Sequence, residues 1–464
     1  MKENKSLFYL IIIIILFFIN YKGEKPIDLA IDKSKEFLEK TDMPDQIIKA
    51  ENDIIVKTNE ENKTIEFKQP EEENKVKSNE MATDSGLQPE LNVIPKSSLG
   101  QKIRVVLNST NFTSLMHNTV SVTSAGAYYV TIDDNRTECA GGYVFTVKDT
   151  DIFDKIFIRP IDINDKIKIT SIKRHNVSPE YRGFLEICKK SGFLVIVNQL
   201  YLEEYLYAVV PSEMPLSFGL EALKVQAICA RTYAIFQMEQ NRFRDYNADV
   251  DDSVNCQVYN NVPENDLTVQ AVNETNSQVI TYNEQVIPAY FFSTSCGNTA
   301  NGEDVWGSRI EYLRAKRQYT GIEFMDFIEL IKTNEFNAYD NASPWFRWQV
   351  TMPHSVEVLA RGQGQNVTRA KINGDIVEGE LRIRQALNPD GYTIYKHDGS
   401  EMNNYTILPS SFFIVADNTI IGGGNGHGVG LSQYGVKGMI EREYSIENIL
   451  KHYYPDTELV QYWK

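Results

Sequence analysis

The sequence is short of positive charge. It has 47 Lys and Arg residues against 63 Asp and Glu residues, which gives a formal net charge of −16 over 464 positions. A nucleic-acid partner is therefore not expected, because such partners require a basic surface. An acidic chain also gains nothing from nonspecific attraction to anionic polymers, so ligand binding has to rely on specific hydrogen bonds. No internal repeat is evident.

The hydrophobic run near the N-terminus lacks a cleavage site after it. Lys2 and Lys5 precede the apolar residues 7–19, and Asn20, Tyr21 and Lys22 follow where small residues would be needed. The run has the length of a signal-peptide core. We therefore interpret residues 1–21 as an uncleaved signal anchor with its basic end in the cytoplasm, the alternative being a buried core helix. This predicts a single-pass cell-membrane protein whose C-terminal domain is extracytoplasmic.

Residues 22–98 have few aromatic side chains and are rich in Glu, Lys, Asn and Asp. Such a stretch cannot bury enough apolar surface to offset its chain entropy, so we predict a disordered tether. Residues 99–464 carry abundant Tyr and Phe and are long enough for a large core. We expect them to form one folded domain, with two subdomains that flank a cleft.

Hydrophobic patterns in this domain predict an α+β fold of mixed sheets with packed helices. The segment 345–350 is a further expected core strand, with Trp345 and Trp348 as alternative ligand-stacking residues. The other strands are expected at 103–107, 143–147, 156–158 and 193–197, and helices at 203–210, 220–238, 266–273 and 446–452.

Glu213 lies between Pro211 and Pro215, just before the predicted helix 220–238. Proline fixes its own φ and disfavours helix at the preceding residue, so we expect Glu213 on a short rigid turn, where a general acid would be well positioned. Its apolar neighbours would raise the carboxyl pKa, whereas the helix N-terminus, Lys224 and Arg231 would favour the ionised form. The alternative is an ordinary solvated Glu.

Lys224 and Arg231 lie seven residues apart on the helix 220–238, for which Ser217 is the expected N-cap. They lie on one face of this helix, away from the face that carries its apolar residues, and from there they could reach a ligand near Glu213. The alternative is a solvated basic face.

Two further segments carry polar side chains beside tight turns. The glycine-rich run 422–435 fits neither G-x-G-x-x-G nor the P-loop, and its glycines indicate positive φ and close backbone approach. Its side chains His427, Ser432 and Gln433 could form hydrogen bonds with sugar hydroxyl and acetamido groups. The alternative is a structural turn before a helix at 431–440. The segment 287–299 predicts a strand that runs into Ser293, Thr294 and Ser295, which could line a carbohydrate cleft or cap a turn.

Together these motifs resemble the stage II sporulation protein D family, peptidoglycan lytic transglycosylases that include the amidase enhancers. The resemblance extends from about residue 101 to the C-terminus. The motifs that carry it are Tyr-Leu-Tyr-Ala-Val-Val-Pro-Ser-Glu-Met-Pro (205–215), Glu-Ala-Leu-Lys-Val-Gln-Ala (221–227), Ala-Arg-Thr-Tyr-Ala (230–234), Cys-Gln-Val-Tyr (256–259), Phe-Ser-Thr-Ser (292–295) and Gly-His-Gly-Val-Gly-Leu-Ser-Gln-Tyr-Gly (426–435).

The resemblance implies that Glu213 is the catalytic acid and that no second carboxylate and no cofactor is needed. The acid would protonate the leaving glycosidic oxygen, then take the proton from the C6 hydroxyl of the N-acetylmuramic acid ring as a 1,6-anhydro ring closes. Peptidoglycan glycan strands are the implied partner, with a cell-wall amidase and a membrane scaffold protein as further partners. Non-catalytic alternatives are an amidase enhancer that binds glycan and an envelope anchor. The implied cleft residues are Lys224, Arg231, Ser293, Ser295, His427 and Gln433.

The sequence departs from the family pattern before Cys256. Some family members bind zinc there through Cys and His, but this chain has Asp251 and Asn255 in their place. Cys256 alone is too few soft ligands for a closed structural site, so we predict no metal. Cys296 stands where many relatives carry glycine, and a disulfide between Cys256 and Cys296 is a hypothesis for an oxidising compartment.

Overall fold

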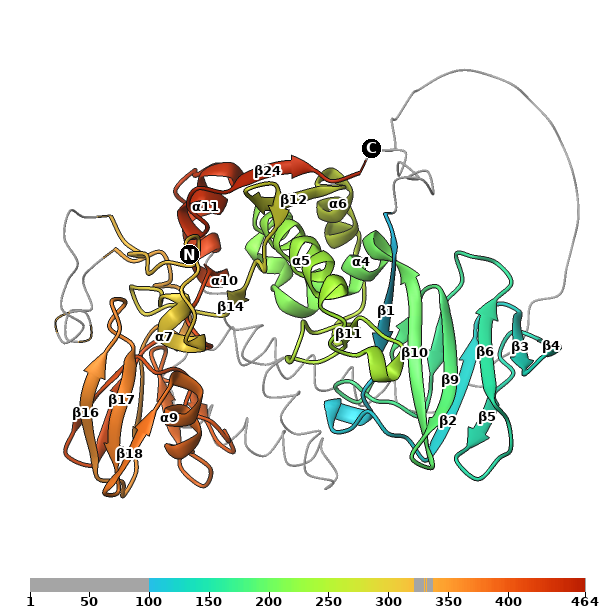
Figure 1. Ribbon diagram of the computed structural model, residues 1–464, viewed down its shortest axis with the longest axis horizontal. Helices are drawn as coiled ribbons and strands as arrows, with labels where there is room; N and C mark the ends of the chain where they lie inside the picture. Colours follow the sequence, from blue (N-terminus) through green and yellow to red (C-terminus); the bar gives the residue numbers. More distant parts are fainter. Residues whose placement is uncertain (1–99, 321–328, 330, 332–336, 464) are drawn as a thin grey trace, which may run out of the picture. The chain divides into compact units, whose positions relative to one another are not determined.

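The computed structural model describes residues 100–320, 329, 331 and 337–463 (Figure 1). The predicted anchor 1–21 and the whole predicted tether 22–98 lie outside these ranges. The described part is a mixed α+β fold, as the hydrophobic patterns predict, and none of its helices is long and apolar enough to cross a membrane. Its seven α-helices are α4 (Leu202–Glu213), α5 (Leu220–Gln240), α6 (Asp266–Glu274), α7 (Gly302–Trp306), α9 (Glu380–Ala386), α10 (Gln433–Ile440) and α11 (Ile446–Tyr453).

Two β-sheets at the start of the described chain share one core. The larger has the strand order β11-β1-β10-β9-β6-β3-β4, and the smaller has the order β5-β2-β7-β8. Alternate residues such as Ile156 and Ile158 of β6 and Val120 and Val122 of β2 are buried between them, as expected for strands with one covered face. The strands are β1 (Lys102–Val106), β2 (Thr119–Ser124), β3 (Tyr128–Ile132), β4 (Asn135–Cys139), β5 (Phe145–Lys148), β6 (Lys155–Pro160), β7 (Ile167–Ile169), β8 (Glu180–Tyr181), β9 (Phe184–Lys190), β10 (Phe193–Tyr201) and β11 (Val250–Asp251).

Helix α5 contacts α4, α6, α10 and α11, and it is therefore buried on several sides. On the apolar face of α5, Leu223, Ala227 and Ala230 are fully buried whereas Leu220 is only partly buried, and the small side chains let the neighbouring helices approach closely. The predicted N-cap is wrong. Gly219, with φ 87°, precedes α5, because Ser217 belongs to a separate 3-10 turn, Leu216–Phe218.

The two prolines around Glu213 act differently from each other. Pro215 ends α4 as predicted, since Met214 before it is extended with φ −126° and ψ 130°. Pro211 does not end the helix, because α4 continues through Pro211 to Glu213. The prediction of a turn at Glu213 is therefore wrong. Burial of Val209, Val210 and Pro211 in the core outweighs the loss of one helical hydrogen bond.

The segment 287–299 and the glycine-rich run lie side by side. Strand β14 (Phe291–Phe292) pairs in parallel with β23 (Leu431–Ser432), which precedes α10. Gly426 and Gly430 have φ of 113° and 77°, and a Cβ on Gly430 would lie 2.2 Å from the carbonyl oxygen of Tyr290. The glycines therefore provide positive φ and close approach, as predicted. Nearby, β12 (Gln278–Tyr282) pairs with β13 (Gln285–Val286) and β24 (Glu458–Gln461).

A second hydrophobic core lies in the chain between β14 and β23. It contains Trp348 of β15, which confirms the expected core strand from that residue on, whereas Trp345 lies in a 3-10 turn and stacks on Tyr405 at 5.4 Å between ring centroids. Figure 1 shows α9 beside β16–β18 in this part of the chain. The strands are β15 (Trp348–Thr351), β19 (Ile394–Lys396), β20 (Glu401–Met402), β21 (Phe413–Ala416) and β22 (Thr419–Gly422) in one sheet, and β16 (Val356–Arg361), β17 (Val367–Ile372) and β18 (Asp375–Glu378) in another.

Most of the predicted elements of the first core are confirmed. The strands expected at 103–107, 156–158 and 193–197 correspond to β1, β6 and β10. The strand expected at 143–147 begins only at Phe145, and the helix expected at 203–210 is longer, as α4. The helices expected at 220–238, 266–273, 431–440 and 446–452 correspond to α5, α6, α10 and α11 within two residues.

Candidate active site

Glu213 is the last residue of α4, and it lines a pocket of about 640 Å³. The pocket takes its walls from α4, α5 and the segment 254–256, from β14 and the glycine-rich run, and from α7 and α9. Among the predicted site residues it contains Glu213, Ser293, His427 and Gln433. The other lining residues are Tyr233, Gln237, Arg242, Val254, Asn255, Cys256, Tyr290, Phe291, Phe292, Trp306, Leu381 and Gly426.

Burial raises the pKa of the Glu213 carboxyl to about 7. The backbone N–H of Val258 donates to its Oε1, and this hydrogen bond opposes the rise only in part. A hydrogen bond from the Gln433 side chain opposes the rise as well, whereas Lys224 and Arg231 are not among the causes, and desolvation is the largest effect. Near neutral pH the carboxyl therefore exists in both forms and can donate a proton as well as accept one.

His427 belongs to the pocket wall, and both its ring nitrogens are bound to backbone groups. The N–H of Val429 donates to Nδ1 over 3.1 Å, and Nε2 lies 3.1 Å from the carbonyl oxygen of Phe291, which assigns the proton to Nε2. Burial lowers the pKa of His427 to about 4, so the ring is neutral. Its centroid lies 5.2 Å from that of Trp306 and 5.6 Å from that of Phe292. The ring thus shapes the wall and leaves no free nitrogen for a ligand.

Gln433, the first residue of α10, holds the end of α4 in place. Its Nε2 donates to the backbone carbonyl of Glu213 over 3.0 Å and lies 3.3 Å from Oε1 of Gln226 on α5. Gln433 therefore positions Glu213 in addition to lining the pocket. Ser293 lines the same pocket, with its Oγ 3.1 Å from Oγ1 of Thr294.

Three of the predicted substrate-binding hydroxyls lie outside the pocket lining, in the buried surroundings of Asp340. The Oγ of Ser295 donates to Oδ2 of Asp340 over 2.7 Å, and the Oγ of Ser432 donates to Oδ1. Thr294 bonds instead to Ser343, at 2.7 Å between the hydroxyl oxygens. Burial raises the pKa of Asp340 to about 6, while these hydroxyl donors oppose the rise. The three hydroxyls thus hold the chain around the pocket together.

Lys224 and Arg231 also lie outside the pocket lining. Lys224 pairs with Glu274 at 2.5 Å and with Glu221 at 2.8 Å. The alternative of a solvated basic face is wrong for the pair, because the side chain of Lys224 is only 15% exposed and that of Arg231 is 0% exposed. Arg231 is fully buried and forms a two-pronged ion pair with Glu203, at 2.6 and 2.7 Å. Its role is structural, because a guanidinium enclosed in this way cannot reach a ligand.

Sequence reasoning missed Arg242, Tyr233, Trp306 and Leu381 as lining residues. Tyr233 lies within the motif 230–234, so a signal for it existed. The others come from separate elements without a local pattern. Trp306 and Leu381 are 44% and 51% exposed, which is visible only in the fold.

The cysteines contradict the disulfide hypothesis. All five, which the structure describes, are unpaired. Cys296 is buried against Gly423, whereas Cys256 lines the pocket. Asp251 binds Oγ of Ser253 at 2.6 Å. In the described ranges no group of three or more His, Cys, Asp or Glu side chains is placed to hold a metal, and the donor set around Cys256 does not fit a closed zinc site.

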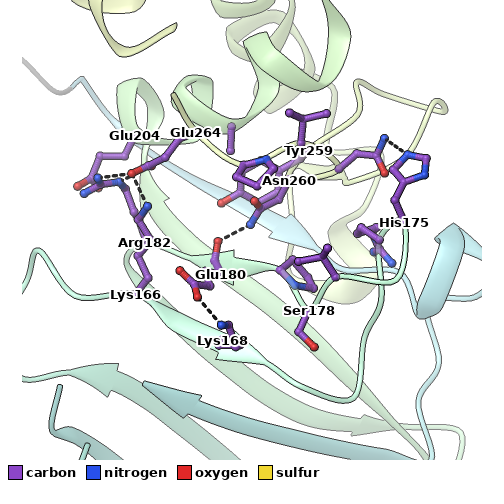
Figure 2. Close-up of a pocket in the computed structure, with 17 residues that line it drawn as sticks. Lys166, Lys168, His175, Ser178, Glu180, Arg182, Glu204, Tyr259, Asn260 and Glu264 are labelled. Carbon is purple, nitrogen blue, oxygen red and sulfur yellow. Dashed lines mark hydrogen bonds and ion pairs between the residues drawn. The ribbon is translucent and has the colours of Figure 1, made fainter. Parts of the chain in front are cut away.

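A second pocket, of about 450 Å³, lies between β7, β8 and the segment 259–264 (Figure 2). Its charges are matched within the protein. Arg182 binds Glu264 at 2.6 and 2.8 Å, and Lys168 binds Glu180 at 2.7 Å. None of the predicted site residues lines this pocket.

The chain is similar in sequence to known proteins over the elements that carry Glu213. The family described as "Stage II sporulation protein" matches residues 190–282, which include α4, α5 and Glu213. Stage II sporulation protein D of Bacillus subtilis is 31% identical over 294 residues, which are 57% of this chain and 75% of that protein. The chain belongs to the stage II sporulation protein D family.

Other relatives of this stage II sporulation protein D family member carry different names. An uncharacterized protein of Brachyspira hyodysenteriae is 31% identical over 290 residues, which are 61% of this chain and 73% of that protein. The amidase enhancer of Bacillus subtilis is 29% identical over 293 residues, which are 55% of this chain but only 40% of that protein. The family resemblance inferred from the motifs is thereby confirmed.

Proposed function

We propose that this protein is a peptidoglycan lytic transglycosylase with Glu213 as its single catalytic acid and base. The observation that carries the proposal is a pocket in which Glu213, with its pKa raised to about 7, is the one carboxylate among the described lining residues. A hydrolysing glycosidase normally needs two carboxylates. An intramolecular transfer needs one, because the substrate supplies its own nucleophile.

The proposed reaction returns Glu213 to its starting state. The protonated carboxyl donates to the glycosidic oxygen as the bond from C1 of N-acetylmuramic acid to that oxygen breaks. The resulting carboxylate then takes the proton from the C6 hydroxyl of the same sugar, whose oxygen forms the new bond to C1. The products are a free N-acetylglucosamine hydroxyl and a 1,6-anhydro end, and no water is consumed. Val258 holds the carboxylate and Gln433 holds the backbone of Glu213 in place for both steps.

The walls of the pocket suit a sugar chain. The rings of Tyr290 and Trp306 lie 4.4 Å apart and form an aromatic surface with His427. Apolar ring faces of sugars stack on such surfaces, while hydroxyl and amide groups can bind Ser293 and Asn255. Leu381 reaches the pocket from the part of the chain that holds the second core, and we take the two cores as subdomains that flank the substrate cleft.

We further propose the placement that the sequence predicts. Residues 1–21 anchor the chain in the cell membrane as a single-pass signal anchor, residues 22–98 form the tether, and the catalytic domain 99–464 lies outside the cytoplasm. In this setting the enzyme remodels the cell wall, and engulfment during sporulation is one such process. The partners are glycan strands, together with a cell-wall amidase and a membrane scaffold protein.

A non-catalytic role is the second candidate, and the relative named amidase enhancer favours it. In that case the pocket would bind glycan without cleavage and would recruit or activate a separate hydrolase. The intact carboxyl in the pocket favours the enzyme.

The test uses purified full-length protein and peptide-free glycan strands, with products analysed by mass spectrometry. Wild type is expected to give anhydro-muramic ends, and Glu213→Gln none, while Glu221→Gln, which changes an exposed Glu on α5, serves as the matched control and keeps the activity. Binding without anhydro ends from wild type would support the amidase enhancer instead.

A further inference from the structure

Arg242 brings a positive charge to the pocket of Glu213. It is the second residue after the end of α5 and follows Asn241, which has the left-handed conformation. The Nη1 of Arg242 donates to the carbonyl oxygen of Asn255 over 2.9 Å. It is the one Lys or Arg among the described lining residues, and no ion pair joins it to a carboxylate in the described ranges. Its side chain is exposed, so its remaining N–H groups are open to a ligand.

The charge of Arg242 acts on the pocket itself. It opposes the rise that burial causes in the pKa of the Cys256 thiol and of the phenols of Tyr233 and Tyr290, all three of which line the pocket. Asp251, an acid near Cys256 and Tyr233, is buried and already bound to Ser253. A positive charge without a carboxylate partner on an acidic chain is a natural place for an anionic ligand group.

We infer that Arg242 binds a free carboxylate of the glycan and makes the pocket select a sugar that carries one over a neutral N-acetylhexosamine. This inference rests on the proposed function. N-acetylmuramic acid bears a lactyl ether whose carboxylate is free where no peptide is attached, whereas N-acetylglucosamine has no such group. A guanidinium binds a carboxylate through two parallel hydrogen bonds, and the bond to Asn255 holds this one in place beforehand.

The aromatic surface makes a separate contribution. Trp306 and Leu381 carry no charge, so they contact an acidic and a neutral sugar alike. Charge selectivity and overall affinity should therefore respond to different substitutions, which allows the role of Arg242 to be measured on its own.

The experiment measures glycan binding by full-length protein in a Glu213→Gln background, in which the ligand is not consumed. The probes are peptide-free glycan oligosaccharides and the same oligosaccharides with every lactyl carboxylate converted to a methylamide. We expect the acid form to bind at least about tenfold more tightly, the range of a hydrogen bond to a charged group. Arg242→Gln should bring the acid form to the affinity of the amide form and leave the amide form unchanged, and Arg242→Lys should keep part of the difference.

Arg244→Gln is the matched control. Arg244 lies two residues away, is exposed and does not line the pocket, so its substitution removes the same charge and should leave the selectivity intact. Equal loss of acid binding in both Gln variants would show a nonspecific charge effect and overturn the inference. Equal affinity of the Glu213→Gln protein with Arg242 intact for the two probes would overturn it as well, while cleavage by the enzyme with Glu213 would leave the proposed function standing. Absence of binding to both probes would also overturn the inference, and it would refute the proposed function only together with absence of anhydro ends from wild type.

Discussion

The side-chain amide of Gln433 donates to the backbone carbonyl of Glu213 over 3.0 Å and joins residues 220 positions apart in the sequence. The start of α10 thereby fixes the end of α4. The same amide lies 3.3 Å from Oε1 of Gln226, so three helices meet behind the carboxyl. The distant C-terminal motif is thus part of the scaffold that positions the proposed acid.

Substitution of Gln433 by Leu should misplace Glu213 while the pocket walls remain. Leu keeps the approximate size of the side chain but cannot donate to the Glu213 carbonyl. Loss of positioning should lower kcat by roughly 10- to 100-fold and change glycan affinity little. Steady-state kinetics and binding on the same preparation would separate the two effects. A variant with lost affinity and unchanged kcat would instead assign Gln433 to substrate binding.

The pKa of Glu213 predicts an upper pH limit for catalysis. The first step requires the protonated carboxyl, and the fraction of that form falls as the pH rises through about 7. We expect kcat/KM to fall about tenfold per pH unit above this value, since this ratio reports the free enzyme. Measurement of initial rates between pH 5 and 9 would check the limit. A profile that is flat across this range would be inconsistent with Glu213 as the acid.

The same shift predicts how stability depends on pH. The carboxyl has a pKa of about 7 in the folded chain against 4.5 as its ordinary value, so the folded state binds more protons between these values and loses stability as the pH rises through this window. Glu213→Gln cannot ionise. Its advantage over wild type in free energy of unfolding should therefore grow from about pH 4.5 and level off above pH 7, at roughly 1–3 kcal/mol. Urea denaturation at pH 5 and 8 would show it, and an equal difference at both values would contradict it.

The sequence predicts the features of the site that are set by local pattern, and it does not predict the features that are set by long-range packing. Short runs of apolar residues predict β6 and β10, and the glycines predict the close approach at Gly430. The sequence also places Glu213 in an apolar neighbourhood, and burial does raise its pKa.

Side-chain directions in the turns could not be read from the pattern. Ser295 and Ser432 occur in motifs that look suited to sugar binding, but both turn toward Asp340, which lies in the part of the sequence with the weakest signals. Pro211 is a local helix breaker that tertiary packing overrides. Arg242 and Trp306 reach the pocket from separate elements, so only the fold brings them together.

Substitution of Arg231 tests whether this residue has a structural or a substrate-binding role. It is fully buried against Glu203, and removal of one partner of such a pair leaves an unpaired buried charge. Arg231→Met should lower the free energy of unfolding by about 3–5 kcal/mol, and the double variant with Glu203→Leu should recover most of this loss. Lys224→Met, which breaks ion pairs to exposed Glu partners, should change it by less than about 1 kcal/mol. An Arg231→Met variant of normal stability with weakened glycan binding would reverse our assignment.

Trp306 should determine glycan affinity without taking part in proton transfer. It is 44% exposed, lines the pocket, and packs against Tyr290 and His427 with its ring tilted by 40° and 51° to theirs. Trp306→Ala removes the largest apolar surface available to a sugar ring, and we expect KM to rise by roughly tenfold, with kcat within about threefold of wild type. Trp306→Phe should lie between the two. Trp345→Ala is the matched control, because Trp345 stacks on Tyr405 and does not line the pocket. Equal effects of the two alanine substitutions would mean that Trp306 acts through stability, whereas a selective rise in KM would place the sugar on its exposed face.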